Sequence, residues 1–225
     1  MWSFRRGAGG ERSSWRFEPR APAPGDRTTA VNPHTDAGPA SSDYLDRLMR
    51  RGSFEALWPL FAKATRPAKE MTESYSALEH LRPFMSGAPC RVIHVGDGAH
   101  ARTGALFALK TEAENVSVDP VLNEPLVEAW RIRFGIRRFA WQRADVFAAI
   151  ERLNALPDMR VLVTFVHAHV PIDDVLARLR WNVAYTLACC QPGHQLSQRH
   201  DVLATGEDPY VLSSGRRFQV LAPRA

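Results

Sequence analysis

Cys90–Lys110, CRVIHVGDGAHARTGALFALK, is the stretch that decides the fold. Its apolar run at 92–95 predicts a buried strand, and the glycines of Gly96-Asp97-Gly98 end that strand. Apolar residues at helical spacing then predict a helix over 101–110. An α/β protein uses a strand, a glycine turn and a helix to form a nucleotide-sized hollow at the carboxyl end of the strand. The same pattern also fits a tight turn that binds nothing.

From residue 88 onward, strand and helix signals alternate along the chain. The predicted strands are 91–95, 115–118, 138–142, 160–166 and 182–188, and the predicted helices between them are 101–110, 124–134, 145–155 and 172–179. After Cys190, a polar loop leads to Tyr210-Val211-Leu212 and then 218–221, which predicts a terminal hairpin. The sequence therefore predicts an α/β, Rossmann-like, mostly parallel seven-stranded sheet with helices on both faces. Right-handed crossovers place all of its strand-to-helix loops at one edge.

The residues before this sheet predict two further regions. Residues 1–40 are rich in Gly, Pro, Ala and Arg, which predicts a disordered tail. The arginines of this tail also suggest an organellar transit peptide, although Glu11 and Glu18 argue against one. Apolar periodicity predicts an N-terminal helical extension over 41–87, ahead of a Rossmann-like domain at 88–225. The helix at 68–85 either braces the core or forms a substrate-side wall, with its polar residues near a ligand: Lys69, Glu70 and Tyr75.

Composition excludes some classes of protein. No run approaches the roughly 18 apolar residues that a membrane span needs, so we expect a soluble, cytoplasmic chain with no membrane partner. The formal net charge of +5 permits a polyanionic partner, but only three of the 29 basic residues are lysine. Such an arginine bias fits a GC-rich genome and is weak support for nucleic-acid binding. The three cysteines do not suggest a disulfide framework, which favours a reducing compartment.

Two carboxylates follow the next two predicted strands. Asp119 comes about 20 residues after the glycine turn, where an acid typically binds the hydroxyls of a ribose. Asp145 follows the third strand, where it can accept a hydrogen bond from an exocyclic amine such as adenine N6. Each has a structural alternative, because Asp119 fits a turn and Asp145 fits a helix N-cap. The ordered set of three loops predicts a nucleoside site.

With this set in place, residues 91–218 resemble the class I S-adenosylmethionine-dependent methyltransferases. In that family the glycine turn lies under the methionine part of the cofactor, and the two acids bind the ribose and the adenine. The resemblance implies S-adenosylmethionine as the cofactor and a methyltransferase activity. Carried over from the family, the cofactor-binding residues are Gly96, Gly98, Asp119 and Asp145, and the predicted set also includes Asp97, Arg102 and Val146. Arg102 enters this set because a guanidinium pairs bidentately with a carboxylate.

Two positions depart from the family's pattern. His94 stands where the family usually has an acid in the first strand, and His100 stands where a third glycine would fall. These departures favour an alternative function, a non-catalytic methyltransferase-like binding or scaffold protein. An NAD-dependent oxidoreductase is a more distant alternative, because position 101 is alanine and G-x-G-x-x-G is absent.

Histidines and cysteines end the fourth and fifth predicted strands. His167 is the candidate general base and His169 lies beside it, although a structural role fits both. Cys189 and Cys190 resemble the cysteine pair of a methyltransferase-like subset that includes RNA-modifying enzymes, which implies RNA as an acceptor. With His169 they are the candidate substrate-binding residues, although both cysteines also fit a packing role. No zinc-binding pattern is present, so no metal site is predicted.

Overall fold

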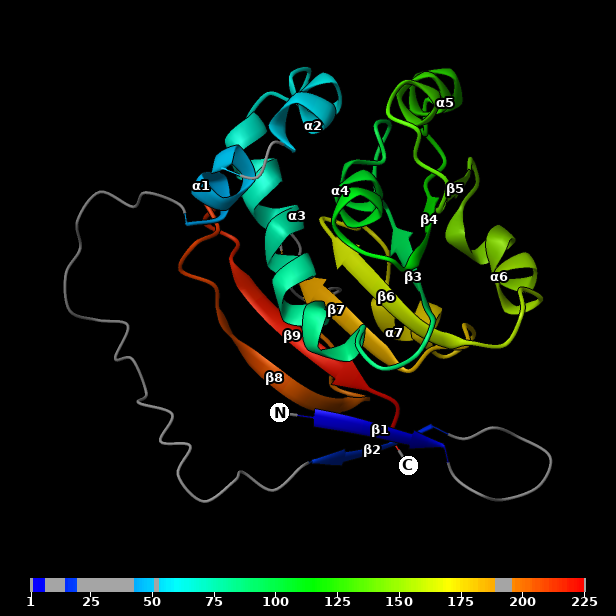
Figure 1. Ribbon diagram of the computed structural model, residues 1–225. Coiled ribbons are helices and arrows are strands. Elements are labelled where there is room, and N and C mark those ends of the chain that lie inside the picture. The colour runs from blue at the N-terminus through cyan, green and yellow to red at the C-terminus, as the bar shows by residue number, and fades with distance from the viewer. Residues whose placement is uncertain (1, 7–14, 20–42, 51–52, 189–195, 225) are drawn as a thin grey trace.

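The computed structural model describes residues 2–6, 15–19, 43–50, 53–188 and 196–224. Its centre is a seven-stranded sheet in the order β5-β4-β3-β6-β7-β9-β8 (Figure 1). The strands are β3 (Cys90–Val95), β4 (Glu114–Val118), β5 (Phe139–Gln142), β6 (Arg160–Val166), β7 (Val183–Leu187), β8 (Asp201–Glu207) and β9 (Arg217–Ala222). The first five are parallel, and β9 is antiparallel to β7 and β8. The prediction of a mostly parallel, Rossmann-like sheet of seven strands is confirmed.

Helices cover both faces of this sheet. One face packs against α3 (Pro67–Leu81), α4 (Arg102–Lys110) and α5 (Glu124–Arg133), and the other against α6 (Val146–Asn154) and α7 (Ile172–Leu176). Neighbouring residues of β3 point into different cores: Val92 belongs to the first and Ile93 to the second. Burial on both faces explains why β3 is a continuous apolar run rather than an alternating one.

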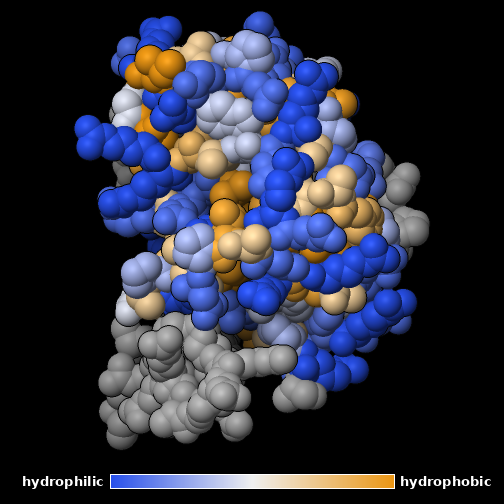
Figure 2. Space-filling view, turned by 90° about the vertical axis from the view of Figure 1, so that its right-hand side faces the viewer, coloured by the Kyte–Doolittle hydropathy of each residue, from blue (hydrophilic) through white to orange (hydrophobic). Residues whose placement is uncertain are grey.

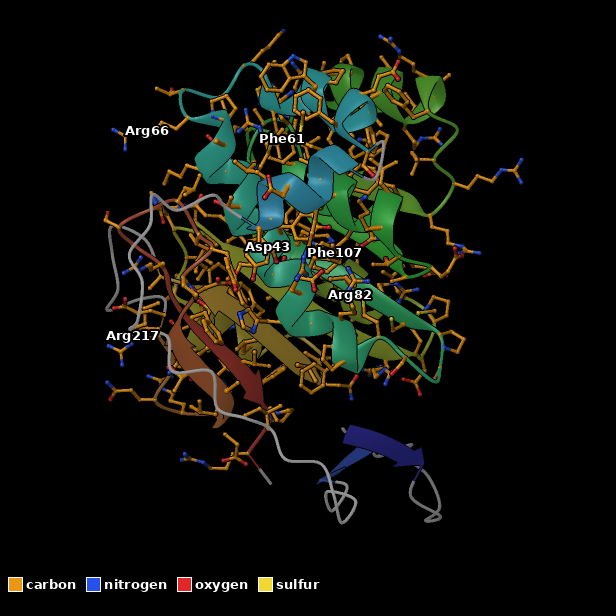
Figure 3. All side chains as sticks on the ribbon, turned by 60° about the vertical axis from the view of Figure 1, so that its left-hand side comes forward. Asp43, Phe61, Arg66, Arg82, Phe107 and Arg217 are labelled. Carbon is orange, nitrogen blue, oxygen red and sulfur yellow. The ribbon has the colours of Figure 1, made fainter. Side chains whose placement is uncertain are left out.

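The N-terminal helices extend the first of these cores. They are α1 (Asp43–Arg50) and α2 (Phe54–Phe61), and a short 3-10 helix, η1 (Arg82–Phe84), follows α3. Figure 3 views the molecule from the side of these helices and labels Phe61 of α2 and Phe107 of α4. Both rings are at most 1% exposed and belong to one apolar cluster. The helical extension therefore shares its core with the sheet.

A buried polar network fixes α3 against the sheet. The Tyr44 hydroxyl donates to Oδ2 of Asp208 at 2.7 Å, and the Ser76 hydroxyl donates to the same oxygen at 2.5 Å. Ser76 Oγ also lies 2.7 Å from the Tyr185 hydroxyl on β7. Burial raises the pKa of Asp208, but hydrogen bonds from His80, Ser76 and Tyr44 outweigh it and hold that pKa below its usual value. The network fixes the position of the whole helix, including its first turns.

The structure differs from the sequence prediction at both ends of the chain. The strand predicted at Tyr210-Val211-Leu212 is wrong, because β9 pairs with β8 at Asp201–Glu207. Most residues of β8 are exposed at the edge of the sheet, so its sequence lacks the apolar alternation of a half-buried strand. At the other end, β1 (Trp2–Arg6) and β2 (Trp15–Pro19) pair antiparallel within the predicted tail. The rest of residues 1–42 lies outside the described residues.

The surface is mainly hydrophilic. Figure 2 shows polar residues around smaller apolar areas on the face it presents. Arg66 and Arg217 are exposed and point away from the molecule (Figure 3). Within the described part of the chain, no helix is both long enough and apolar enough to cross a membrane.

Candidate functional site

A cavity of about 510 Å³ opens at the carboxyl ends of the parallel strands. It lies where the strand order reverses, since the chain goes from β3 to β4 on one side and to β6 on the other. This volume falls within the range of roughly 300–1,000 Å³ that is typical of small-molecule sites. The cavity is lined by Lys69, Glu70, Glu73, Ser74, Val95, Gly96, Asp97, Gly98, Arg102, Thr103, Val118, Asp119, Pro120, Asp145, Val146, Val166, His167, His169 and Val170.

The glycine turn forms the floor of this cavity. Gly96 has a φ of +70°, and a Cβ there would lie 2.9 Å from both Cα and Cβ of Ala168. Gly98 has a φ of +71° and no close neighbour, and its backbone N–H donates to Oδ2 of Asp119 at 2.8 Å. Only glycine adopts these conformations readily, and only Gly96 also permits the close approach of the segment after β6. The sequence prediction of a ligand-sized hollow at this turn agrees with the geometry.

Asp119 lies at the end of β4, beside Gly98, and is 7% exposed. Its Oδ1 accepts the N–H of Val121 at 2.8 Å, so each carboxylate oxygen is held by one backbone N–H. A carboxylate oxygen accepts more than one hydrogen bond, so both oxygens keep capacity for a ligand. The arrangement suits two adjacent hydroxyls, as in a ribose.

Asp145 and Val146 line the same cavity at the start of α6. The Asp145 Oδ1 accepts the N–H of Phe147 at 2.8 Å, which makes Asp145 the N-cap of this helix. The structural alternative for Asp145 is therefore confirmed. Capping fixes the carboxylate without removing it from the cavity, so both roles are compatible.

Asp97 has a structural task within the turn. Its carboxylate accepts the N–H groups of Thr103 and Gly104 at 2.8 and 2.9 Å, and the Ser117 hydroxyl at 2.6 Å. Burial raises the pKa of Asp97 to about 6, against the lowering effect of these hydrogen bonds. Although Asp97 lines the cavity, its oxygens fix the start of α4 to β4. Direct binding of a cofactor by this residue stays a prediction.

Arg102 is paired within the protein. Its guanidinium forms an ion pair with Glu70 on α3, and its Nε donates to the carbonyl of Leu60 on α2 at 2.8 Å. Nδ1 of His100 lies 3.3 Å from another guanidinium nitrogen. Arg102 therefore ties the glycine turn to the N-terminal helices at one wall of the cavity. Its predicted contact with a cofactor carboxylate stays a prediction.

The two histidines that depart from the family's pattern do not line the cavity, as far as the described residues show. His94 is fully buried within the sheet, where Nδ1 lies 2.9 Å from Oγ1 of Thr164 and Nε2 lies 3.1 Å from Oδ1 of Asn115. Burial lowers the pKa of His94 to about 4, so the ring is neutral at pH 7. His94 links β3 to both neighbouring strands and does not replace a ligand-binding acid.

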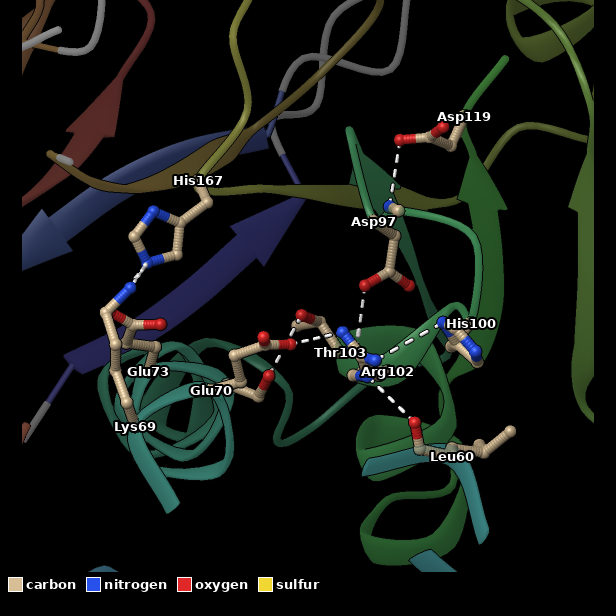
Figure 4. A network of polar contacts seen from close by, with 12 residues as sticks. Leu60, Lys69, Glu70, Glu73, Asp97, His100, Arg102, Thr103, Asp119 and His167 are labelled. Atoms are coloured by element: carbon tan, nitrogen blue, oxygen red, sulfur yellow. Dashed lines mark hydrogen bonds and ion pairs between the residues drawn. The ribbon is translucent and has the colours of Figure 1, made fainter. Parts of the chain in front are cut away.

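Three polar residues form the opposite wall (Figure 4). Nε2 of His167 lies 2.6 Å from Oε1 of Glu73, and Nζ of Lys69 lies 3.3 Å from the same oxygen. The Lys69 Nζ is also 3.2 Å from the His167 Nε2. His167 follows β6 and has a φ of +56°, which is rare for a residue other than glycine. The candidate base is therefore at the cavity, held against two charged residues of α3.

The other predicted site residues have different outcomes. His169 lines the cavity, as expected. Tyr75 is 1% exposed and stacks on Tyr44 at 5.3 Å, away from the described cavity lining, so the expectation of Tyr75 near a ligand is wrong. Cys189 and Cys190 lie outside the described residues. Within the described residues there is no group of three or more His, Cys, Asp or Glu that could hold a metal ion.

Glu73 is the residue that sequence analysis missed. It is a fully buried acidic residue, and it lies on a helix whose sequence suggests an ordinary solvated glutamate. One signal was present, because Lys69 and Glu73 are four residues apart and therefore meet on one helix face. The other partner, His167, lies far away in the sequence, so no local pattern could have found it.

Comparison with known proteins gives structural similarity alone. No protein-family model matches the chain, and no curated protein matches it. Magnesium protoporphyrin IX methyltransferase (ChlM) from Synechocystis PCC 6803, with bound SAM, shares 11% identity at a TM-score of 0.47, covering 84% of this chain and 100% of that one. An rRNA methylase from Streptococcus thermophilus shares 12% identity at a TM-score of 0.42, and the match covers 61% of this chain and 88% of that one.

A third similar structure is the bifunctional kinase-methyltransferase WbdD, with 18% identity and a TM-score of 0.43. The match covers 72% of this chain but only 40% of WbdD. Because these identities are low and these TM-scores are below 0.5, the similar structures do not indicate a function for this chain.

Proposed function

We propose that this protein binds S-adenosylmethionine in the cavity and transfers the methyl group to an acceptor. The observation that carries the proposal is the pairing of Gly98 and Asp119, where a backbone N–H at 2.8 Å fixes a buried carboxylate beside a glycine turn. The turn lies at the point where the strand order reverses, which is where α/β sheets bind nucleotides. Asp145 and Val146 extend the same wall toward the position of an adenine.

The charge of the cavity supports a cationic ligand. Its described lining holds two basic side chains, Lys69 and Arg102, against five acidic ones: Glu70, Glu73, Asp97, Asp119 and Asp145. An acidic cavity favours a sulfonium cation and disfavours a pyrophosphate, so S-adenosylmethionine fits better than a dinucleotide. Methyl transfer needs little from the protein beyond in-line positioning of donor and acceptor, because the sulfonium already activates the methyl carbon.

A non-catalytic binding or scaffold protein is the alternative that His94 and His100 favoured. In the structure His94 is a neutral residue buried in the sheet, and His100 contacts Arg102; neither is among the described residues that line the cavity, so neither side chain obstructs a cofactor there. The acceptor remains a proposal. RNA is one candidate, and His169 is the described acceptor-side residue predicted from the sequence.

Calorimetry with S-adenosylmethionine and S-adenosylhomocysteine tests this function. We expect saturable binding of both ligands and none of NAD, whose pyrophosphate meets the acidic wall. No heat and no thermal shift at millimolar S-adenosylhomocysteine would contradict the proposal. Incubation with methyl-labelled cofactor, followed by counting of RNA, protein and small-molecule fractions, then identifies the acceptor class.

A further inference from the structure

Glu73 is the described residue of the cavity lining whose buried side-chain oxygens have no hydrogen bond. Its side chain is 0% exposed, and its Oε1 faces both Lys69 and His167. Both oxygens are buried and make no hydrogen bond within the described residues, and Oε2 has neither of these two neighbours. A buried carboxylate oxygen without a donor is costly, so a donor from outside the protein, such as a water, an ion or a ligand, is expected to contact it. Glu73 lines the cavity, so a ligand can supply this donor.

The position of Glu73 assigns it to the acceptor side. It contacts His167 at the end of β6, whereas Asp119 follows β4 on the other side of β3. In Figure 4, Glu73 and His167 lie on one side of Asp97 and Arg102, and Asp119 lies beyond Asp97. A donor whose ribose contacts Asp119 would therefore direct its reacting end toward Glu73.

We propose that Glu73 binds the methyl acceptor, and that the acceptor is a nitrogen or oxygen carrying a hydrogen that it donates to Oε2 of Glu73. This inference rests on the proposed function. It narrows the acceptor to amines, N–H groups and hydroxyls, and excludes acceptors without a hydrogen to donate. His167, the candidate base predicted from the sequence, and Lys69 are then positioning residues that lie beside Oε1.

The transfer balances with these groups. The lone pair of the acceptor forms a bond to the methyl carbon, and the carbon–sulfur bond breaks with its electron pair going to sulfur. The sulfonium becomes a neutral thioether. The proton of the acceptor passes to Oε2 of Glu73, which becomes a neutral carboxylic acid and later releases the proton to water.

Three known ligands test the proposal without knowledge of the acceptor. S-adenosylhomocysteine is neutral at sulfur, and S-adenosylmethionine has a cation there but no hydrogen-bond donor. Sinefungin carries an amine-bearing carbon in place of the S-methyl group, so it places N–H donors where the methyl group lies. We expect the wild-type protein to bind sinefungin about tenfold more tightly than S-adenosylhomocysteine, as for a charge-assisted hydrogen bond to a buried carboxylate.

The variant Glu73→Gln separates this contact from the rest of the site. We expect it to reduce the preference for sinefungin to about threefold or less, while the affinity for S-adenosylhomocysteine stays nearly unchanged. S-adenosylmethionine should lose less affinity than sinefungin, because its sulfonium makes no hydrogen bond. Glu79→Gln is the matched control, since Glu79 lies on the same helix but pairs with Arg82 and Arg47 away from the cavity.

Each outcome decides the proposal. An equal sinefungin preference in the wild-type protein and Glu73→Gln would overturn it, and so would a wild-type protein that binds S-adenosylhomocysteine without preferring sinefungin. If Glu73→Gln does not fold, the wild-type preference for sinefungin over S-adenosylmethionine decides, because both ligands carry a positive charge there and only sinefungin donates a hydrogen bond. A wild-type protein that binds none of the three ligands would contradict the proposed function itself, which distinguishes the two failures.

Discussion

The two walls of the cavity are built in different ways. On the β3–β4 wall, mainly backbone N–H groups hold the carboxylates, with Gly98 donating to Asp119 and Gly104 donating to Asp97, which also accepts the Ser117 hydroxyl. On the α3 wall, side chains hold side chains, as in the contact of His167 with Glu73 and the ion pair of Arg102 with Glu70. Backbone donors are fixed by the fold itself, whereas paired side chains keep rotamer freedom. The first wall is therefore preorganised, and the second can adjust to different ligands.

Gly96→Ala should damage the preorganised wall most. A Cβ at Gly96 requires both a φ of +70° and a 2.9 Å approach to Ala168, so we expect a loss of about 3 kcal/mol in the free energy of unfolding. Gly98→Ala is the matched control, with a similar φ but no neighbour within 4 Å, and should cost about 1 kcal/mol. Urea denaturation measures both. Equal losses in the two variants would show that the close approach to Ala168 does not matter.

The buried His94 on β3 should make the free energy of unfolding depend on pH. Burial lowers its pKa to about 4, below the value near 6.5 of an unfolded histidine, so the unfolded chain binds a proton first as the pH falls. The stabilising effect of neutral His94 is thus complete above pH 6.5 and is lost as the pH falls toward 4. Relative to His94→Gln, the wild-type protein should lose about 2–3 kcal/mol of unfolding free energy across this window.

Urea denaturation at several pH values between 4 and 7 checks this prediction. Asp97 also titrates in this range, with a pKa of about 6, but it does so in both proteins and cancels in the comparison. Parallel stability profiles for the wild-type protein and His94→Gln would contradict the buried, neutral assignment of His94.

On the α3 wall we expect a smaller change in the free energy of unfolding. The side chains of Arg102 and Glu70 are 17% and 30% exposed, so a double-mutant cycle with Arg102→Met and Glu70→Gln should give a coupling of about 1 kcal/mol. In the pair of Arg82 and Glu79 the arginine is 44% exposed, so this pair should give about 0.3 kcal/mol. Chemical denaturation of the four proteins in each cycle provides both values. A coupling for Arg102 and Glu70 no larger than that for Arg82 and Glu79 would remove the distinction between them.

The contrast between the walls also explains what the sequence could predict. The glycine turn, Asp119 and Asp145 follow predicted strands, so the parallel sheet alone brings them to one edge. Their spacing is a local property, and the structure places all of them at the cavity. The parallel strands and the helical layers on both faces of the sheet follow from the same alternation of strand and helix signals.

The α3 wall could not be predicted in this way. Glu73 and His167 meet only because α3 is fixed across the sheet by its contacts with Asp208 and Tyr185, which lie much later in the chain. The edge strand β8 was missed for a related reason, because its exposed residues need no apolar pattern. In both cases the structure depends on tertiary contacts, which the local periodicity of the sequence does not predict.

The central claim is that Asp119 holds the ribose of S-adenosylmethionine. Calorimetric titration of S-adenosylhomocysteine into the wild-type protein and Asp119→Ala, with thermal unfolding as the check that both are folded, tests it most directly. We predict that the affinity falls roughly 10- to 100-fold, equivalent to about 1–3 kcal/mol for the lost hydrogen bonds of a buried carboxylate. Unchanged affinity in a folded Asp119→Ala protein would contradict the claim.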